Sequence, residues 1–237
     1  MRYTKDDKGR FAQRPYYTDA ELNSLCDQKI TEFLIKKHGK VSFPIETDDL
    51  KSLIERDASD LDAFADLSGE GPGVQGVTDF TPGKKPKVRI SETLSGDASE
   101  HRLRTTLSHE WGHVWLHTPL YDAIQPGLDL FPTCCSKPHQ CHRDTIIEAH
   151  ARDWMEWQAG FVCGAILMPI SHVQGILNSI AEHNGQYEPA LINTPHANGL
   201  INTLADTYHV SKDAARVRLE RMGRIDRVPQ QNLTLLF

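Results

Sequence analysis

The chain has 237 residues, of which 39% are hydrophobic and 24% charged, with a formal net charge of −6 at pH 7. These values are typical of a globular protein of one or two domains, and the mild acidity argues against a protein that binds nucleic acid over its whole surface. The longest apolar run, residues 161–170, is too short for a membrane-spanning helix, which needs roughly 20 residues. We therefore expect no contact with a membrane. The N-terminus is charged where a secretory signal would carry its apolar core, which predicts a cytoplasmic protein.

Cysteine and histidine are the informative residue types. The chain contains five cysteines, and an odd set in a chain long enough to bury its own core predicts reduced thiols rather than a disulfide framework. Twelve histidines are unusual for this length, so their positions carry much of the functional information.

Two segments are expected before the main module. Residues 1–17 carry five basic and two acidic side chains without apolar periodicity, which predicts a mobile basic arm. Residues 18–72 predict an N-terminal helical segment, with one helix from about Asp19 and two shorter helices after it. The apolar positions of these helices are Leu22, Leu25, Ile30, Phe33 and Leu34, then Leu50, Leu53 and Ile54, and finally Leu61, Phe64 and Ala65.

An antiparallel hairpin is expected at the start of the module that spans residues 73–198. Residues 74–80 and 87–90 are short strand-like runs on either side of a turn rich in Gly and Pro. With helices before and after it, this small sheet predicts a mainly helical α+β fold.

A long helix is expected directly after the hairpin. Asp97 and Glu100 have the spacing of a capping box, and the apolar residues that follow have helical periodicity. The helix is expected to end near His117, because Pro119 pushes Thr118 out of the helical region.

Residues 118–143 show no clear period, and two further helices are expected after them. The first runs from about Thr145 and ends before Pro169. The second opens near Ser171 and closes at Gly185.

The stretch Leu107–His117 reads LSHEWGHVWLH and contains the pattern H-E-x-x-H on the expected long helix. Residues four apart lie on one face of an α-helix, so His109 and His113 can direct their imidazole nitrogens at one zinc ion. Glu110 can then reach a water on the metal and act as the general base.

A third ligand has to come from elsewhere. His117 lies eight residues from His109, about 12 Å along the helix axis, so we expect it at the helix end or beside a ligand rather than on the metal. The next expected helix offers four candidates: Glu148, His150, Asp153 and Glu156. Asp153 and Glu156 share a helix face, so one of them should ligate the metal and the other orient a histidine. The spacing leaves both assignments open.

Two stretches of the sequence resemble one known family. They are Leu107–His117 and the later run Glu156–Pro169, EWQAGFVCGAILMP. Together they resemble the ImmA/IrrE family of zinc metallo-endopeptidases, which pairs an H-E-x-x-H helix with a helix of the form E-x-x-A-x-x-x-A-x-x-L-L-M-P. The resemblance implies a zincin-like fold with a small antiparallel sheet. It makes His109 and His113 zinc ligands, Glu110 the catalytic acid and base, and Glu156 the third ligand.

Three protein ligands leave the fourth position on zinc for water, which is typical of a catalytic rather than a structural site. We therefore expect a zinc endopeptidase that hydrolyses a peptide bond. The family resemblance implies a protein substrate, for example a helix-turn-helix transcriptional repressor cleaved in response to stress or to the induction of a mobile element. If a free edge of the sheet lies beside the zinc, an extended substrate segment could add to it as a strand.

Residues 134–142 hold a dense group of thiols and imidazoles. The group consists of Cys134, Cys135, His139, Cys141 and His142. Such side chains can bind a second, structural metal, but their spacing matches no common zinc finger. The two alternatives are a loop with reduced thiols and a redox-sensitive pair of cysteines.

Residues 199–237 predict two helices joined by a tight turn, similar to a DNA-binding helix-turn-helix. Ser211 is expected to cap the second helix, from which Arg216, Arg218 and Arg221 could face phosphates. However, the segment carries six basic against four acidic residues, a weak excess for DNA affinity. Similar segments end many ImmA/IrrE proteins, where they support the catalytic module.

Two other classes of function stay open from the sequence. One is a DNA-binding transcriptional regulator with a vestigial or structural zinc site, and the other is a metal-dependent amidase that acts on a small molecule. The regulator would bind duplex DNA in a salt-dependent way whatever residue stands at position 110. A peptidase would instead lose its cleavage products when Glu110 is replaced by Gln.

Overall fold

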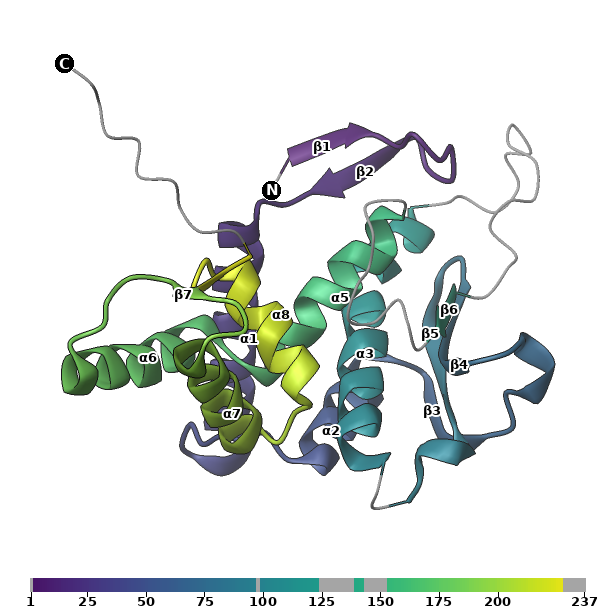
Figure 1. Cartoon of the computed structure of the whole chain (residues 1–237). Coiled ribbons are helices and arrows are strands. Elements are labelled where there is room, and N and C mark those ends of the chain that lie inside the picture. The colour runs from purple at the N-terminus through teal and green to yellow at the C-terminus, as the bar shows by residue number, and fades with distance from the viewer. Residues whose placement is uncertain (1, 97–98, 124–138, 143–152, 228–237) are drawn as a thin grey trace.

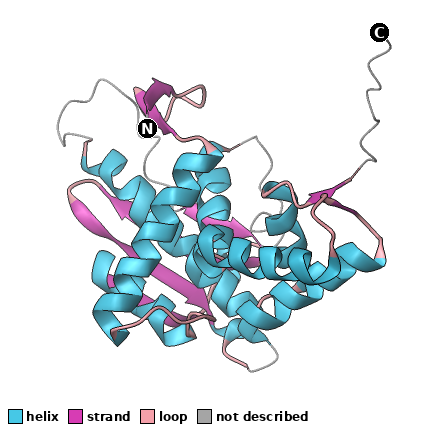
Figure 2. Ribbon diagram, turned by 90° about the vertical axis from the view of Figure 1, so that its left-hand side faces the viewer, coloured by secondary structure: helices cyan, strands magenta, loops and turns pink. Residues whose placement is uncertain are grey.

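The chain combines a group of helices with a small sheet, so the expected α+β class is confirmed (Figure 1). A computed structural model describes residues 2–96, 99–123, 139–142 and 153–227, with only the backbone described for 139–142. The sheet lies on one side of the molecule and helices fill the other (Figures 1 and 2). Between them runs α3 (Glu100–Asp122), which contacts both the sheet and α5 (Trp154–Leu167).

The N-terminal residues form a hairpin, so the expectation of a mobile basic arm is wrong. β1 (Arg2–Lys5) and β2 (Gln13–Tyr16) pair in antiparallel register. Figure 1 shows this hairpin at the top of the molecule. It is held to the rest of the chain by contacts with α5, because Arg10 donates two hydrogen bonds, of 2.9 and 2.8 Å, to the Asp153 carboxylate.

Asp6 organises the turn of this hairpin. Its buried carboxylate accepts hydrogen bonds from the backbone N–H groups of Lys8, Arg10 and Phe11, and from the indole N–H of Trp154. The charges and the lack of apolar periodicity predict a mobile arm, because nothing in the local sequence shows that Asp6 accepts a hydrogen bond from the distant Trp154.

The first two expected helices are confirmed as α1 (Asp19–His38) and α2 (Thr47–Asp57). Thr18 and Glu21 form a capping box at the start of α1, and Gly39 ends the helix in the left-handed conformation.

The third expected helix, at Leu61 to Ala65, is wrong. These residues form β3 (Asp60–Ala65), which pairs in parallel with β5 (Lys84–Ser91). Exposed and less exposed positions alternate along β3, which is the period of a strand. The helix expectation rested on the apolar spacing of Leu61, Phe64 and Ala65, but the Phe64 side chain points to solvent.

The expected hairpin is confirmed as β4 (Val74–Thr81) and β5. The turn is tighter than expected, because Thr81 already pairs with Lys84 and Gly83 supplies a positive φ of 71°. β6 (His139–His142) pairs antiparallel with β4 on the side away from β5, which gives the strand order β3-β5-β4-β6. Two short 3₁₀ helices, η1 (Ser68–Glu70) and η2 (Glu92–Leu94), flank the hairpin.

The long helix α3 extends five residues beyond the expected end at His117. Pro119 lies inside its last turn, where the missing N–H removes only one hydrogen bond. Continuing the helix buries Tyr121, whose ring stacks on Phe80 and meets Phe11 edge to face. At the other end, Glu100 is the first helical residue, and Asp97 lies outside the described residues.

The helix α5 ends before Pro169, as the sequence predicts, and its start at Trp154 follows an N-cap at Asp153. The expected start at Thr145 lies outside the described residues. α6 (Ile170–Asn184) begins one residue before the expected position and ends at Gly185 in the left-handed conformation.

The two expected C-terminal helices are present as α7 (Pro195–Tyr208) and α8 (Lys212–Arg221). Ser211 caps α8 as expected by accepting a hydrogen bond from the backbone of Ala214. Two short parallel strands, β7 (Ala190–Leu191) and β8 (Ile225–Asp226), join the ends of this region.

One large hydrophobic core joins the helices and the inner face of the sheet. It includes buried side chains from α1, α2, β5, α3, α5, α6, α7 and α8. Among the described residues, no single helix is long and apolar enough to cross a membrane. The pair α5 and α6 reaches that length and apolarity only together, with a bend of 55° between them.

Candidate metal centre

Two histidines of α3 and one glutamate of α5 bring their ligand atoms together. The Nε2 atoms of His109 and His113 lie 3.0 Å apart. Glu156 Oε2 lies 3.2 Å from the first nitrogen and Glu156 Oε1 lies 3.2 Å from the second. This group could hold a metal ion, since its ligand atoms all lie within 4.8 Å of one another.

The spacing of these atoms fits a tetrahedral metal site. Zinc bonds of about 2.0–2.1 Å place tetrahedral ligand atoms roughly 3.3–3.4 Å apart. The observed separations of 3.0 to 3.2 Å need shifts of only a few tenths of an ångström to reach that geometry. Two neutral imidazole nitrogens and a carboxylate oxygen are also a common ligand set for zinc. The donor set and its spacing therefore fit the expected metal.

Burial makes the group electrostatically unusual. The side chains of His109 and His113 are almost fully buried, whereas that of Glu156 is 14% exposed. Burial lowers the pKa of His109, but the hydrogen bond and negative charge of Glu156, with the charge of Glu110, outweigh it and raise this pKa overall. Glu156 thus attracts positive charge to the centre, whether a proton or a metal ion carries it.

A close approach of two helices positions the ligands. A Cβ atom added at Gly112 would lie 3.2 Å from the backbone oxygen of Ala159 and 3.3 Å from Cβ of Val162. A side chain at position 112 would push α3 and α5 apart by a few tenths of an ångström, and the distance between these helices sets the reach of Glu156 to the two histidines.

Glu110 lies on the sheet side of α3. Its fully buried carboxylate accepts a hydrogen bond from the hydroxyl of Thr78 on β4, with 2.5 Å between the oxygens. The neighbouring Gly76 leaves room for this carboxylate, because a Cβ atom at Gly76 would lie 2.5 Å from Glu110 Oε1. The strand therefore fixes the position of the expected general base.

His117 lies beside His113 and outside the group of three residues that could hold a metal ion. Its Nδ1 lies 3.1 Å from Nδ1 of His113, and its Nε2 lies 3.1 Å from Oε1 of Gln158. The second carboxylate behaves differently from the expectation. Asp153 caps α5 and forms an ion pair with Arg10, and among the described residues it contacts no histidine.

The local backbone explains this difference. Asp153 and Glu156 would share a helix face only if both residues lay within one helix. Asp153 has extended backbone angles and precedes the first helical residue, so its side chain turns back to the backbone N–H of Met155.

Sequence reasoning missed three residues of the site, Thr78, Gly76 and Gln158. Gln158 is the polar residue in an otherwise apolar buried face of α5. Because buried polar side chains are almost always hydrogen-bonded, such a residue indicates a polar partner on a neighbouring element. Thr78 and Gly76 lie more than 30 residues before Glu110 and carry no local signal of their contact with it.

Several other candidates lie outside the described side chains. Cys134 and Cys135 lie outside the described residues, and so do Glu148 and His150. His139 and Cys141 lie on β6, of which only the backbone is described. A second metal at this cysteine group therefore stays a prediction from the sequence.

The three arginines that suggested phosphate contacts are engaged with groups of this chain. Arg218 is buried and donates to the backbone oxygen of Met168, and its burial lowers the pKa of the guanidinium to about 10. Arg221 lies over the ring of Phe161. Arg216 forms an ion pair with Glu220. Arg218 and Arg221 therefore anchor α8 on α5, and Arg216 pairs within α8, so all three arginines have partners within this chain.

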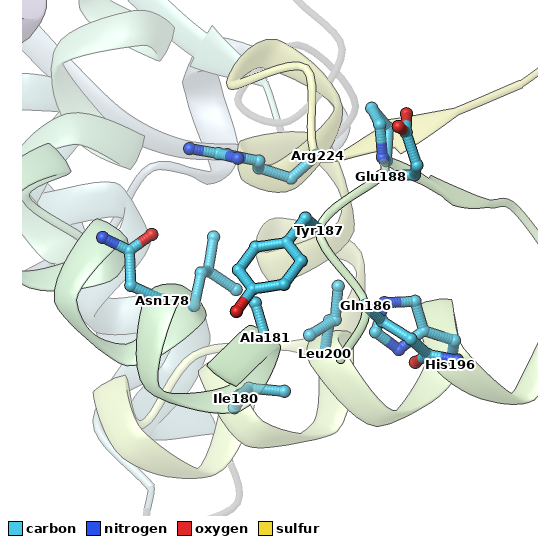
Figure 3. A pocket seen from close by; sticks show the side chains of 11 residues that line it. Asn178, Ile180, Ala181, Gln186, Tyr187, Glu188, His196, Leu200 and Arg224 are labelled. Carbon is cyan, nitrogen blue, oxygen red and sulfur yellow. The ribbon is translucent and has the colours of Figure 1, made fainter. Parts of the chain in front are cut away.

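Two surface features bear on substrate access. β4 runs beside Glu110, but residues 74–78 of its outer edge pair with β6, so the condition for adding a substrate strand to this edge of β4 is not met. A pocket elsewhere is lined by residues of α6 and α7, by residues 186–189 and by Arg224 (Figure 3). Its lining includes Tyr187, His196 and Arg224, and none of the ligand residues.

The sequence matches no model of a known protein family and no curated protein. Function is therefore inferred from the H-E-x-x-H motif and from the geometry of His109, His113 and Glu156.

Proposed function

We propose that this protein is a zinc-dependent endopeptidase with a zincin-like catalytic module. The convergence of His109, His113 and Glu156 beside Glu110 supports the proposal most strongly. These residues come from two helices, and their atoms have the spacing of three ligands of one tetrahedral ion.

The ligand set suits zinc and catalysis. Imidazole and carboxylate ligands suit several divalent metals, and a tetrahedral arrangement of three protein ligands is typical of catalytic zinc. When bound, zinc acts as a Lewis acid that polarises a carbonyl group and makes a water molecule more acidic.

Glu110 is the proposed general base and acid. It follows His109 directly in the helix, and the hydroxyl of Thr78 holds one of its carboxylate oxygens. The carboxylate takes a proton from the attacking water and delivers it to the leaving amine as the peptide C–N bond breaks. Thr78 keeps the carboxylate in place between these two transfers.

The substrate proposed here is a protein, and the resemblance to ImmA/IrrE peptidases suggests a helix-turn-helix transcriptional repressor. Two features of the fold are consistent with this kinship. One is the small sheet before the proposed metal-binding helix, and the other is the C-terminal helix pair, in which α8 packs on α5 and α7 packs on α8. The two alternatives, a DNA-binding regulator and a small-molecule amidase, have no specific support among the described residues.

The substitution Glu110→Gln tests the activity. The zinc-loaded protein is incubated with a mixture of denatured proteins, and new chain termini are identified by mass spectrometry. We expect cleavage by the native protein and none by Glu110→Gln, which keeps the three ligands and therefore its zinc. Cleavage that survives the substitution would refute the mechanism. Turnover of short acylated amides with no cleavage of proteins would favour the amidase.

A further inference from the structure

A chain of buried hydrogen bonds links the N-terminal hairpin to one of the proposed ligands. The side-chain nitrogen Nε2 of Gln158 donates to the backbone oxygen of Pro15 on β2 over 2.9 Å. Oε1 of the same amide lies 3.1 Å from His117 Nε2, and His117 Nδ1 lies 3.1 Å from His113 Nδ1. The chain of contacts therefore ends on the ring whose other nitrogen faces Glu156.

The direction of each hydrogen bond follows from the chemistry of the groups. The Pro15 carbonyl can only accept, so the amide of Gln158 presents its NH₂ to Pro15 and its oxygen to His117. That oxygen also can only accept, so Nε2 of His117 carries a hydrogen. A neutral imidazole has one N–H, which leaves a lone pair on Nδ1 of His117.

The hydrogen of the proposed ligand His113 lies on Nδ1. The lone pair on His117 Nδ1 accepts a hydrogen bond from Nδ1 of His113, which must therefore carry the hydrogen. The lone pair of His113 is then on Nε2, where it accepts a hydrogen bond from Nε2 of His109 over 3.0 Å in the metal-free protein and would bind a metal ion when one is present. In the opposite tautomer, two lone pairs would face each other at 3.1 Å in a buried place.

We propose that Gln158 and His117 are positioning residues that hold His113 in its metal-binding tautomer, and that the hairpin β1–β2 completes this arrangement through Pro15. The proposal rests on the metal centre of the proposed function but not on peptide hydrolysis. Metal-binding histidines in proteins commonly donate their second N–H to a group that sets ring orientation and raises affinity. Here that group is another histidine, set in turn by an amide.

Two substitutions at Gln158 separate this role from a structural one. Gln158→Glu keeps an oxygen that accepts from His117, whereas Gln158→Met keeps the length of the side chain and removes the acceptor. If Gln158 acts only by filling space, Glu should be worse than Met, because it buries a charge against the Pro15 carbonyl. If it sets the tautomer, the order is reversed. Ile166→Val, a buried change on the same helix away from the histidines, is the matched control.

The experiment measures cobalt(II) affinity by absorbance titration and zinc affinity by competition with a chelator, at one fixed pH. We expect Gln158→Met to weaken both affinities roughly 10- to 100-fold, with Gln158→Glu and Ile166→Val within a few-fold of the native protein. Histidine ¹⁵N spectra of the metal-free protein should show hydrogen on Nδ1 of His113 in the native protein and a mixture of tautomers in Gln158→Met.

The failures can be told apart. A native protein that binds neither metal would refute the metal centre, and with it both proposals. Normal binding by the native protein and by Gln158→Met, or a greater loss in Gln158→Glu than in Gln158→Met, would overturn the positioning role and leave the proposed function standing.

Discussion

Gly112 on α3 and Ala159 on α5 meet so closely that a Cβ atom at Gly112 would lie 3.1 Å from Cα of Ala159. The two helices carry the three proposed ligands, so this contact sets the distance across which Glu156 reaches the histidines. A substitution that adds a Cβ atom at Gly112 should therefore affect the metal centre without replacing any ligand.

For Gly112→Ala we expect a loss of zinc affinity of roughly tenfold or more, similar to the effect of disturbing groups that orient a ligand. The free energy of unfolding should change less than the free energy of zinc binding. Ala has a higher helix propensity than Gly, by about 1 kcal/mol, and this gain offsets part of the cost of overpacking. Gly175→Ala in α6 is the matched control, since an added Cβ there meets nothing within 4 Å. Equal zinc affinity in the two variants would contradict this account of the helix contact.

Gly76→Ala should affect catalysis and leave metal binding intact. The new methyl group would lie 2.5 Å from Glu110 Oε1 and 2.8 Å from Cγ2 of Thr106, so the carboxylate has to move. A displacement of about 1 Å in a catalytic group can cost on the order of 100-fold in rate. We expect such a loss of peptide cleavage with unchanged zinc content. A variant that cleaves normally would show that Glu110 is not the base.

The sequence reveals most about contacts that are local. The spacing of His109 and His113 places both on one helix face, and no tertiary information is needed to see it. Glu156 lies 47 residues after His109, and only the resemblance of its helix to a known pattern selected it over Asp153. The hydrogen bond between Pro15 and Gln158 joins residues 143 positions apart. No pattern in the sequence predicts it, and only the folded structure shows it.

Errors in the expected elements have the same origin. The apolar spacing at Leu61 to Ala65 predicts a helix, but parallel pairing with β5 makes this segment a strand. The helix α3 continues past Pro119 because burial of Tyr121 outweighs one lost hydrogen bond. In both cases a tertiary contact overrides a local preference.

Arg104 should be a major source of stability. Its buried guanidinium donates to the backbone oxygens of Ile45, Tyr208 and His209, over 2.6, 3.1 and 3.2 Å, and so ties α3 to two distant segments. Arg104→Met would leave the carbonyls of Ile45 and Tyr208 without this donor, whereas the His209 oxygen keeps its contact with Nδ1 of His101. We expect the change to cost about 3 kcal/mol in the free energy of unfolding.

Denaturant unfolding of Arg104→Met beside Arg102→Met checks this expectation. Arg102 is exposed on the same helix, so its replacement should change the unfolding free energy by less than about 0.5 kcal/mol. Similar stabilities for the two variants would mean that the carbonyls find other partners.

The hydrogen bonds of Asp6 in the hairpin should make the free energy of unfolding depend on pH. Burial raises the pKa of Asp6, but hydrogen bonds from Lys8, Trp154 and Phe11 and the charge of Arg10 outweigh it, so this pKa lies below its ordinary value of 3.8. A carboxyl whose folded pKa is lowered stabilises the fold above its ordinary pKa, and the contribution disappears as the pH falls through the lowered value.

We therefore expect Asp6→Asn to lower the unfolding free energy at pH 7 by about 1–3 kcal/mol, and by progressively less as the pH falls below about 4. Urea titrations of both proteins between pH 7 and pH 2.5 measure the difference. A difference that stays constant over this range would show that the negative charge of Asp6 contributes nothing.

The most direct measurement is the zinc content per chain of the native protein, Glu156→Gln and Asp153→Asn, each purified without chelator and supplied with zinc. The two acids lie three residues apart, but the structure places only Glu156 at the histidines and Asp153 on Arg10. We expect one zinc in the native protein and in Asp153→Asn, and little or none in Glu156→Gln. No zinc in the native protein, or full zinc in Glu156→Gln, would contradict the metal centre on which the proposed function depends.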